Sequence, residues 1–459
     1  MPLMRWVICG FVLYVLVTAM VPRDLRIGLV VAGALGFGYY AVVKFWSARD
    51  LSGRFGLALP AVQLVSNARR WQNLMVALGL DRTMSERAPM SLVPRPVQYV
   101  PAVLDVQPAS YGAVVRVQGV SGHSLPIWRS AAPQLASALG VGAVIVSEPT
   151  PNVFALALRV IDPLAEPLIL EDVLLPASSG LLLGIDEQGE WLEMSYSNTS
   201  GCVIGGIPGS GKSAYLLQGL ASLATDPAIQ FALIDGKQGH DLSALAGRAY
   251  MYLTGDDAGD LTIVRDALSD VHVVMQQRLK RSIDLWDGQS NFWSYGPSQE
   301  HPLVVLVVDE CQHYLDVRSL TSKEDKTLAA EIDGIIRDLV KRGRSAGILV
   351  VLLTQRPTAE SIPTAIRDNC GLRVSFGVRT REAAVAVLGD LSSEDGVSPI
   401  GLPPGVGIAS VNGELVRFRA PFVNDDLVSN VVRTHAGLTA DPLDLLARAL
   451  SSDVPDVIE

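Results

Sequence analysis

A glycine-rich segment at residues 206–213 constrains the fold of this chain more than any other feature. Its letters, GIPGSGKS, fit the phosphate-binding pattern G-x-x-x-x-G-K-[ST] at every fixed position. The apolar residues 202–204 before it predict a buried strand, and residues 213–223 after it predict a helix. In that arrangement the backbone N–H groups and the helix N-terminus face phosphate oxygens. The segment therefore predicts a nucleotide-binding α/β domain.

Each position of this segment has an expected contact with a nucleotide. Lys212 would contact the β- and γ-phosphates and the Ser213 hydroxyl would bind Mg²⁺, so ATP with Mg²⁺ is the expected cofactor. The expected nucleotide-binding residues are Gly206, Ile207, Pro208, Gly209, Ser210, Gly211, Lys212, Ser213 and Ala214. A glycine-rich turn that binds nothing is the alternative, and the flanking strand and helix argue against it.

A pair of carboxylates follows a second buried strand. Residues 303–308 are all apolar, which is typical of a central parallel strand buried on both faces, and Asp309 and Glu310 come directly after them. We expect Asp309 to lie in the Mg²⁺ shell. Glu310 is expected to be the general base that polarises the attacking water. A solvated acidic strand end is the alternative.

Two further strands are expected to end at the same edge of the sheet. Residues 231–234 lead into the turn Asp235-Gly236-Lys237, and residues 348–353 lead into the letters TQRP at 354–357. Side chains at strand ends point into the crevice beside the nucleotide, so Gln355 is expected to sense the γ-phosphate. Otherwise it is a polar residue that only ends the strand. The alternation of strands and helices predicts a parallel α/β sheet.

The overall charge excludes a protein that binds nucleic acid through a broadly basic surface. The 459 residues carry a formal net charge of −10, so any DNA contact needs a local basic surface. With 49% hydrophobic and 18% charged residues, the chain can bury a large core in about two or three domains. Its 4 cysteines form no C-x-x-C pair, which argues against a zinc site and a disulfide framework.

The N-terminal region contains two apolar runs without charged residues, at 6–22 and 27–43. Each run has roughly 17 residues, near the lower limit for crossing a bilayer, and together they predict a transmembrane hairpin within residues 1–48. A signal peptide is the alternative for the first run, which lacks a small-x-small cleavage site. Arg49, Arg54, Arg69 and Arg70 follow the second run. They predict a multi-pass protein of the cell membrane with both termini and the nucleotide site in the cytoplasm.

Four regions are expected after the hairpin. They are a juxtamembrane connector at 49–93, a small α+β domain at 94–178, the nucleotide-binding domain at 179–426 and a helical tail at 427–459. The α+β domain contains residues that alternate as in strands and a short helical stretch at 130–139. It has no group of residues suited to catalysis, so the chemistry is expected in the nucleotide-binding domain.

Several short motifs follow one another in the nucleotide-binding domain. They are Gly205 with the glycine-rich segment, Asp235-Gly236-Lys237, Asp309-Glu310, GRSAG at 343–347 and TQRP at 354–357. In combination they resemble the FtsK/SpoIIIE family of membrane-anchored DNA-pumping ATPases, over about residues 184–426. The resemblance implies a RecA-like fold, a homo-hexameric ring and double-stranded DNA in its pore. It also implies that Arg344, or else Arg342, completes the site of a neighbouring subunit. Such an arginine could instead only neutralise helix-end carbonyls.

The chain departs from the cell-division members of that family. It has only two predicted spans and no long Pro/Gln-rich linker, and the stretch after Asn424 is too short for a winged-helix module that reads DNA polarity. In these respects it is similar to the transfer proteins of actinobacterial conjugative plasmids and integrative elements. The resemblance implies DNA transfer between cells or compartments, or chromosome partitioning, with further transfer or division proteins as partners.

No motif assigns the residues that contact DNA, and two groups of cations are candidates. Lys280 and Arg281 precede an aromatic-rich segment at 286–295, which would line the pore or pack at the edge of the ring. Arg379 and Arg381 follow a predicted strand and would contact the DNA backbone. Two other functions stay open: a type VII-secretion-like ATPase that drives protein export, and a coupling protein for single-stranded DNA.

Overall fold

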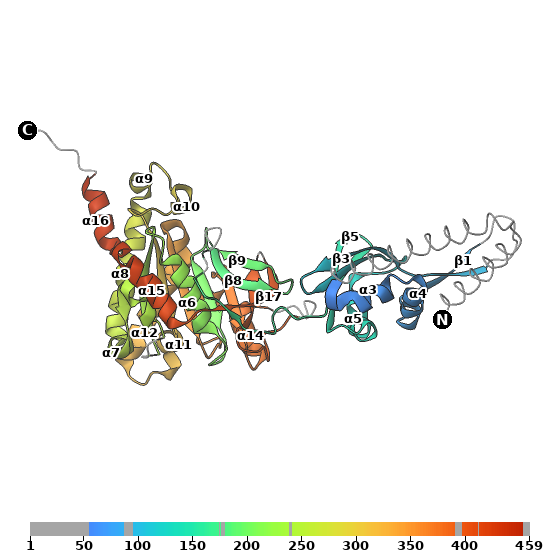
Figure 1. Cartoon of the computed structure of the whole chain (residues 1–459). Helices are drawn as coiled ribbons and strands as arrows, with labels where there is room; N and C mark the ends of the chain where they lie inside the picture. Colours follow the sequence, from blue (N-terminus) through green and yellow to red (C-terminus); the bar gives the residue numbers. More distant parts are fainter. Residues whose placement is uncertain are drawn as a thin grey trace, which may run out of the picture. The chain divides into compact units, whose positions relative to one another are not determined.

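The computed structural model describes residues 55–86, 95–173, 175, 180–237, 241–390, 397–411 and 413–452 (Figure 1). Contacts divide the chain into two compact units, with the boundary between Asp162 and Pro163. The transmembrane hairpin predicted within residues 1–48 lies outside the described residues. Within the described ranges, no helix is both long and apolar enough to cross a membrane.

The first unit is a small α+β fold. Its antiparallel sheet has the order β3 (Ala102–Ala109), β4 (Gly112–Gln118), β6 (Val153–Arg159), β5 (Ala143–Thr150), and the other elements are η1 (Gly56–Ala58), α3 (Leu59–Val65), α4 (Ala68–Ala77), β1 (Arg82–Glu86), β2 (Arg95–Tyr99) and α5 (Leu125–Leu139). Val115 and Val117 alternate along β4 and meet Trp128 of α5 in one core. Trp71 and Met75 of α4 join that core. The unit therefore includes residues that the sequence assigned to the connector at 49–93.

The second unit is built on one ten-stranded sheet. Its order is β12 (Ala249–Leu253), β11 (Ile229–Asp235), β13 (Leu303–Asp309), β14 (Ile348–Thr354), β10 (Gly201–Gly205), β15 (Leu372–Phe376), β16 (Val406–Val411), β17 (Glu414–Arg419), β8 (Gly180–Asp186) and β9 (Trp191–Ser195). The strands from β12 to β15 are parallel to one another, and the rest pair antiparallel. The predicted parallel α/β sheet is confirmed for the part that carries the motifs.

Helices cover both faces of this sheet (Figure 1). Val305 and Val307 of β13 pack into one core with α6 (Lys212–Leu223) and α15 (Asp425–His435), whereas Val304 and Leu306 pack into the other with α8 (Leu261–Lys280) and α12 (Lys323–Arg342). The remaining helices are η2 (Ser243–Arg248), α7 (Gly255–Gly259), α9 (Ser282–Leu285), α10 (Phe292–Tyr295), α11 (Gln312–Leu315), η3 (Val317–Ser319), η4 (Gly343–Ala346), α13 (Thr364–Arg367), α14 (Arg381–Leu388), η5 (Ala436–Leu438) and α16 (Pro442–Ser452). Because successive residues of β13 face two different cores, the whole strand has to be apolar.

The second unit extends beyond the predicted limits of 179 and 426 at both ends. At its start, β7 (Leu168–Ile169) pairs with β18 (Pro421–Phe422), and the buried Arg419 donates from Nε to the Leu164 carbonyl over 2.8 Å. At its end, Val428 and Val432 of α15 lie in the same core as α6. Contacts between residues far apart in the sequence therefore set both limits, and local composition did not reveal them.

One buried arginine ties α8 to the edge of the sheet where the parallel strands begin. The Arg278 guanidinium donates to the carbonyls of Pro302, Ala346 and Gly347 over 2.8, 2.9 and 3.4 Å. It also lies over the ring of Phe292, 5.7 Å from its centroid. Neutral carbonyl oxygens thus accept hydrogen bonds from both terminal nitrogens of a cation that is only 2% exposed.

Replacement of this arginine should destabilise the second unit. We expect Arg278→Met to lower the free energy of unfolding by about 3 kcal/mol, because buried carbonyls lose their donor. Denaturant unfolding of the full chain would measure it. The exposed helix arginine in Arg433→Met is the matched control and should change stability by less than about 0.5 kcal/mol. Equal stability of the two variants would contradict the role given to Arg278.

Candidate functional site

The glycine-rich loop joins β10 to α6 and is fixed by backbone contacts with neighbouring strands. The Ile207 N–H donates to the Gly377 carbonyl, and the Gly405 N–H donates to the Ser210 carbonyl, both over 2.9 Å. At Gly211 φ is +106°, and a Cβ there would lie 3.0 Å from the Gly405 backbone. Glycine is required at this position by both conformation and space. Ala214 follows in the first turn of α6.

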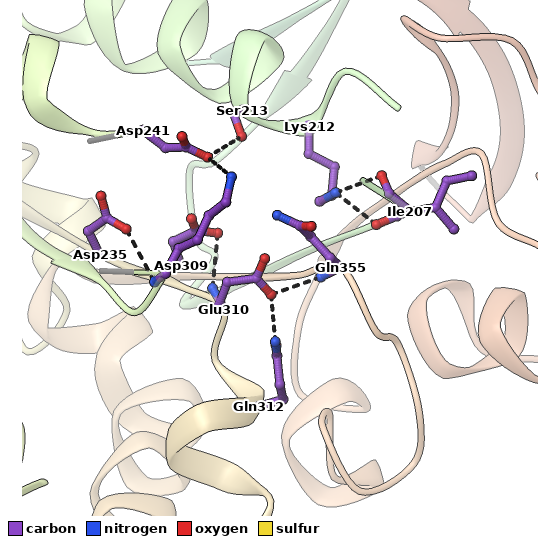
Figure 2. Close-up of polar contacts among 11 residues, drawn as sticks. Ile207, Lys212, Ser213, Asp235, Asp241, Asp309, Glu310, Gln312 and Gln355 are labelled. Atoms are coloured by element: carbon purple, nitrogen blue, oxygen red, sulfur yellow. Dashed lines mark hydrogen bonds and ion pairs between the residues drawn. The ribbon is translucent and has the colours of Figure 1, made fainter. Parts of the chain in front are cut away.

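Lys212 is held by the loop that it belongs to. Its Nζ donates to the carbonyls of Gly206 and Ile207 over 2.7 and 3.1 Å (Figure 2). Burial lowers the pKa of Lys212 to about 8, although the carboxylates of Glu310 and Asp309 act in the opposite direction. A phosphate would therefore have to draw the ammonium group away from these two carbonyls.

Carboxylates gather beside the Ser213 hydroxyl. Ser213 Oγ donates to Asp241 Oδ2 over 3.3 Å, and Lys237 Nζ lies 2.8 Å from the same oxygen. Asp309 stands opposite Asp235 in the register of β13 and β11. Burial and the neighbouring Glu310 raise the pKa of Asp309 to about 7, and burial also raises the pKa of Asp235.

These groups fit a hard divalent cation. Asp235 is fully buried, and its Oδ2 has no hydrogen-bond partner among the described residues. Ser213, Asp309 and Asp235 thus offer hydroxyl and carboxylate oxygens, the donor type that Mg²⁺ prefers. The sequence analysis missed Asp241, although a carboxylate shortly after the Asp235-Gly236-Lys237 turn was a signal for it.

Glu310 directs its carboxylate into the site from an unusual backbone conformation. Its φ is +48°, and its N–H donates to Asp309 Oδ1 over 2.9 Å. Glu310 Oε2 accepts hydrogen bonds from Gln312 Nε2 over 2.6 Å and from the Gln355 N–H over 3.1 Å (Figure 2). The structure therefore brings Gln355 next to Glu310 through its backbone, and adds Gln312, which the sequence analysis did not identify.

A cavity of about 1180 Å³ opens beside these residues. Pro208, Lys237, Glu310 and Gln355 line its inner part. The rest of the lining is Asp256, Gly259, Asp260, Leu261, Gln312, His313, Tyr314, Asp316, Leu320, Asp325, Arg356, Thr358 and Ser361. The cavity is large enough for a nucleotide γ-phosphate, a water and a side chain from elsewhere.

Arg344 lies at the opposite edge of the sheet from its own glycine-rich loop. It belongs to η4, directly before β14, whereas the loop follows the end of β10, which runs parallel to β14. The 7 residues of β14 span about 23 Å, so the exposed Arg344 side chain does not reach the site of its own chain. The alternative residue, Arg342, is paired with Asp338 over 3.0 Å.

The candidate DNA contacts fall on both edges of the sheet. Lys280 and Arg281 end α8 on the same edge as Arg344, and Arg281 lies 3.6 Å from Asp284. Arg379 and Arg381 are exposed after β15, on the edge that carries the glycine-rich loop. Trp286 and Phe292 are fully buried in the core, so these aromatics of segment 286–295 do not line a pore.

The chain is similar in sequence to curated bacterial proteins. It is 26% identical over 286 residues to a DNA translocase FtsK of Vibrio vulnificus, a match that covers 55% of this chain and 27% of the relative. It is 22% identical over 405 residues to a DNA translocase FtsK of Sporosarcina ureae, with 84% of this chain and 47% of the relative covered. The chain thus spans less than half the length of these relatives. No family model matches it.

A solved structure shares the fold. The pCW3 conjugation coupling protein TcpA, in its monomer form with ATPγS, aligns with a TM-score of 0.52 and 19% identity. The alignment covers 73% of this chain and 93% of that chain. At this identity the likeness concerns the fold alone.

The geometry of the site and the sequence comparisons support the same resemblance. The loop, the paired carboxylates Asp309 and Glu310, and the TQRP turn meet at one edge of a parallel sheet. The Sporosarcina ureae relative named DNA translocase FtsK covers 84% of the chain, so its match includes these motifs. The chain is a P-loop ATPase related to the DNA translocases named FtsK, which confirms the resemblance that its motifs predicted.

Proposed function

We propose that this chain is an ATP-driven translocase of double-stranded DNA. The observation that carries the proposal is the complete nucleotide site, in which the buried Lys212 and Glu310 lie beside the Ser213 and Asp309 oxygens. The relatives named DNA translocase FtsK support DNA as the substrate. The chain spans only part of the length of those relatives. Its motifs for ATP hydrolysis lie in the second unit, which we call the motor unit.

The residues of the site divide the work of ATP hydrolysis. The N–H groups of the glycine-rich loop and Lys212 bind the phosphates, after Lys212 leaves the Gly206 and Ile207 carbonyls. Ser213 and Asp309 would hold Mg²⁺, which supplies charge neutralisation at the phosphates. Glu310 accepts a proton from the attacking water, and Gln355 senses the γ-phosphate from the end of β14.

We further propose that the ring is a head-to-tail hexamer in which Arg344 acts on the neighbouring site. The distance along β14 prevents Arg344 from serving its own site, and its side chain is exposed on the edge that a neighbour would meet. Besides Glu310, four carboxylates line the cavity that would receive it, namely Asp256, Asp260, Asp316 and Asp325. Opposite charges of this kind favour association of the two edges.

A membrane anchor and a role in DNA transfer complete the proposal. The apolar runs at 6–22 and 27–43 support an anchor in the cell membrane, with the motor in the cytoplasm. TcpA, which shares the fold, is a conjugation coupling protein, and this supports DNA transfer between cells as the process. Chromosome partitioning is the other candidate process. Lys280, Arg281, Arg379 and Arg381 are the proposed DNA contacts.

DNA stimulation of ATP hydrolysis tests the proposed function. We would measure turnover of the full chain in detergent with linear duplex DNA, with single-stranded DNA of equal nucleotide content, and without nucleic acid. Strong stimulation by the duplex alone is the expected outcome. Stimulation by single strands would instead identify a single-stranded DNA coupling protein. Basal turnover that responds to neither would favour the protein-export alternative.

Glu310→Gln and Lys212→Ala should separate hydrolysis from binding. Glu310→Gln should bind ATP and lose about 10²- to 10⁴-fold in turnover, because the base is removed while its hydrogen-bonding shape is kept. Lys212→Ala should lose nucleotide binding, since it removes the cation that contacts the phosphates. A fluorescent ATP analogue and a phosphate-release assay would measure the two properties. Normal turnover in either variant would refute the site.

Mixing two inactive variants tests the role of Arg344 between subunits. Arg344→Ala should bind ATP but fail to hydrolyse it in rings, because each site lacks the neighbour's arginine. Glu310→Gln should fail because each site lacks its own general base. A mixture should regain part of the activity, because some interfaces then pair an intact Glu310 with an intact Arg344. Phosphate release from mixed rings is the measurement. A mixture as inactive as its components would rule out action on the neighbour.

A further inference from the structure

The side chain of Gln312 connects the carboxylate of Glu310 with the end of β14. Gln312 Nε2 donates to Glu310 Oε2 over 2.6 Å, and Gln312 Oε1 accepts a hydrogen bond from Thr354 Oγ1 over 2.8 Å. Thr354 is fully buried. Three side chains from two neighbouring strand ends thus form one continuous chain of hydrogen bonds, which we name the Gln312 relay.

The direction of every bond in the Gln312 relay is determined. The Arg356 N–H donates to Thr354 Oγ1 over 3.0 Å, so the single hydroxyl hydrogen of Thr354 is available to Gln312. The amide oxygen of Gln312 therefore faces Thr354, and its NH₂ group faces Glu310. The reverse orientation would place the Gln312 amide oxygen against the Glu310 carboxylate oxygen. The bonds thus form a continuous path from the Arg356 N–H to the carboxylate of Glu310.

Hydrogen bonds within the protein hold the Glu310 carboxylate in one orientation. Oε2 accepts N–H groups from Gln312 and from the Gln355 backbone, so the carboxylate cannot turn without breaking both bonds. The positive φ of Glu310, +48°, is unfavourable for a residue with a side chain, so the surrounding contacts have to maintain it. Lys212 is bound to its own loop at the same time. Both catalytic groups are therefore occupied by internal hydrogen bonds.

We propose that Gln312 is a positioning residue that restrains Glu310 until the turn after β14 moves. Gln355 and Arg356 of that turn line the same cavity as Glu310, so an occupant of the cavity would contact the turn directly. When the Arg356 N–H leaves Thr354, the hydroxyl can rotate, the hold on Gln312 weakens and Glu310 is released. The inference rests on the proposed function, because it concerns how that ATPase is kept slow without DNA.

Two variants break the Gln312 relay at different points. Gln312→Met keeps the length of the side chain and removes both amide groups. Thr354→Val keeps the shape of threonine and removes the hydroxyl, whereas Thr354→Ser restores a hydroxyl at the same place. Gln277→Met, at an exposed position of α8, is the matched control for loss of a glutamine.

Turnover without nucleic acid is the decisive measurement. Gln312→Met and Thr354→Val should each raise DNA-free turnover by about five- to tenfold, the scale expected for loss of one ordinary hydrogen bond. The rate with saturating duplex DNA and the KM for ATP should change less than about twofold. The double variant should have no higher DNA-free turnover than either single variant, because both changes break the same chain of hydrogen bonds. Thr354→Ser should return DNA-free turnover towards that of the unmodified protein, and Gln277→Met should not alter it.

A fall or no change in DNA-free turnover of Gln312→Met and Thr354→Val would overturn the inference. A fall would mean that Gln312 orients Glu310 for catalysis instead of restraining it. Failure of the proposed function looks different, because the unmodified protein would then not respond to duplex DNA at all. Nucleotide affinity and the thermal midpoint of each variant identify a folding defect. If Gln312→Met does not fold, the DNA-free turnover of Thr354→Val tests the inference alone.

Discussion

The parallel register of four strands is the constraint on which the whole site depends. Because β10, β11, β13 and β14 run in the same direction, their ends meet at one edge of the sheet. That edge receives the glycine-rich loop, Asp235, the Asp309–Glu310 pair and the turn after Thr354. Burial of β13 on both faces fixes the strand between two layers of helices, so its carboxylates cannot move far.

The same arrangement explains why two edges of the motor unit differ in chemistry. The strand ends carry the carboxylates and the cavity, whereas the strand beginnings carry the ends of α8 and α12 with Lys280, Arg281, Lys341, Arg342 and Arg344. Cations at helix C-termini are stabilised by the exposed carbonyls there. Local helix chemistry therefore accounts for the cations on the edge where the strands begin, without any contact with another subunit.

The sequence predicted the parts of the site that depend on local pattern. The glycine-rich loop, the apolar strand 303–308 and the carboxylates after it could be predicted because each is contained in one short segment. Asp241 and Gln312 were missed, because their roles arise from contacts with Ser213 and Thr354, which belong to segments at other strand ends. The limits of the motor unit were missed for the same reason, since Arg419 and Leu164 lie 255 positions apart in the chain.

Arg419 has a mechanical consequence. Its guanidinium donates to the Leu164 and Ala165 carbonyls and, over 2.6 Å, to the Pro404 carbonyl. The next residue, Gly405, donates its N–H to Ser210 in the phosphate-binding loop. A pulling force on the chain near Leu164, where the second unit begins, would therefore act on β17 and the 404–405 turn before it could separate β7 from β18. The segment at which the second unit begins is thus connected, through Pro404 and Gly405, to the loop that binds phosphate.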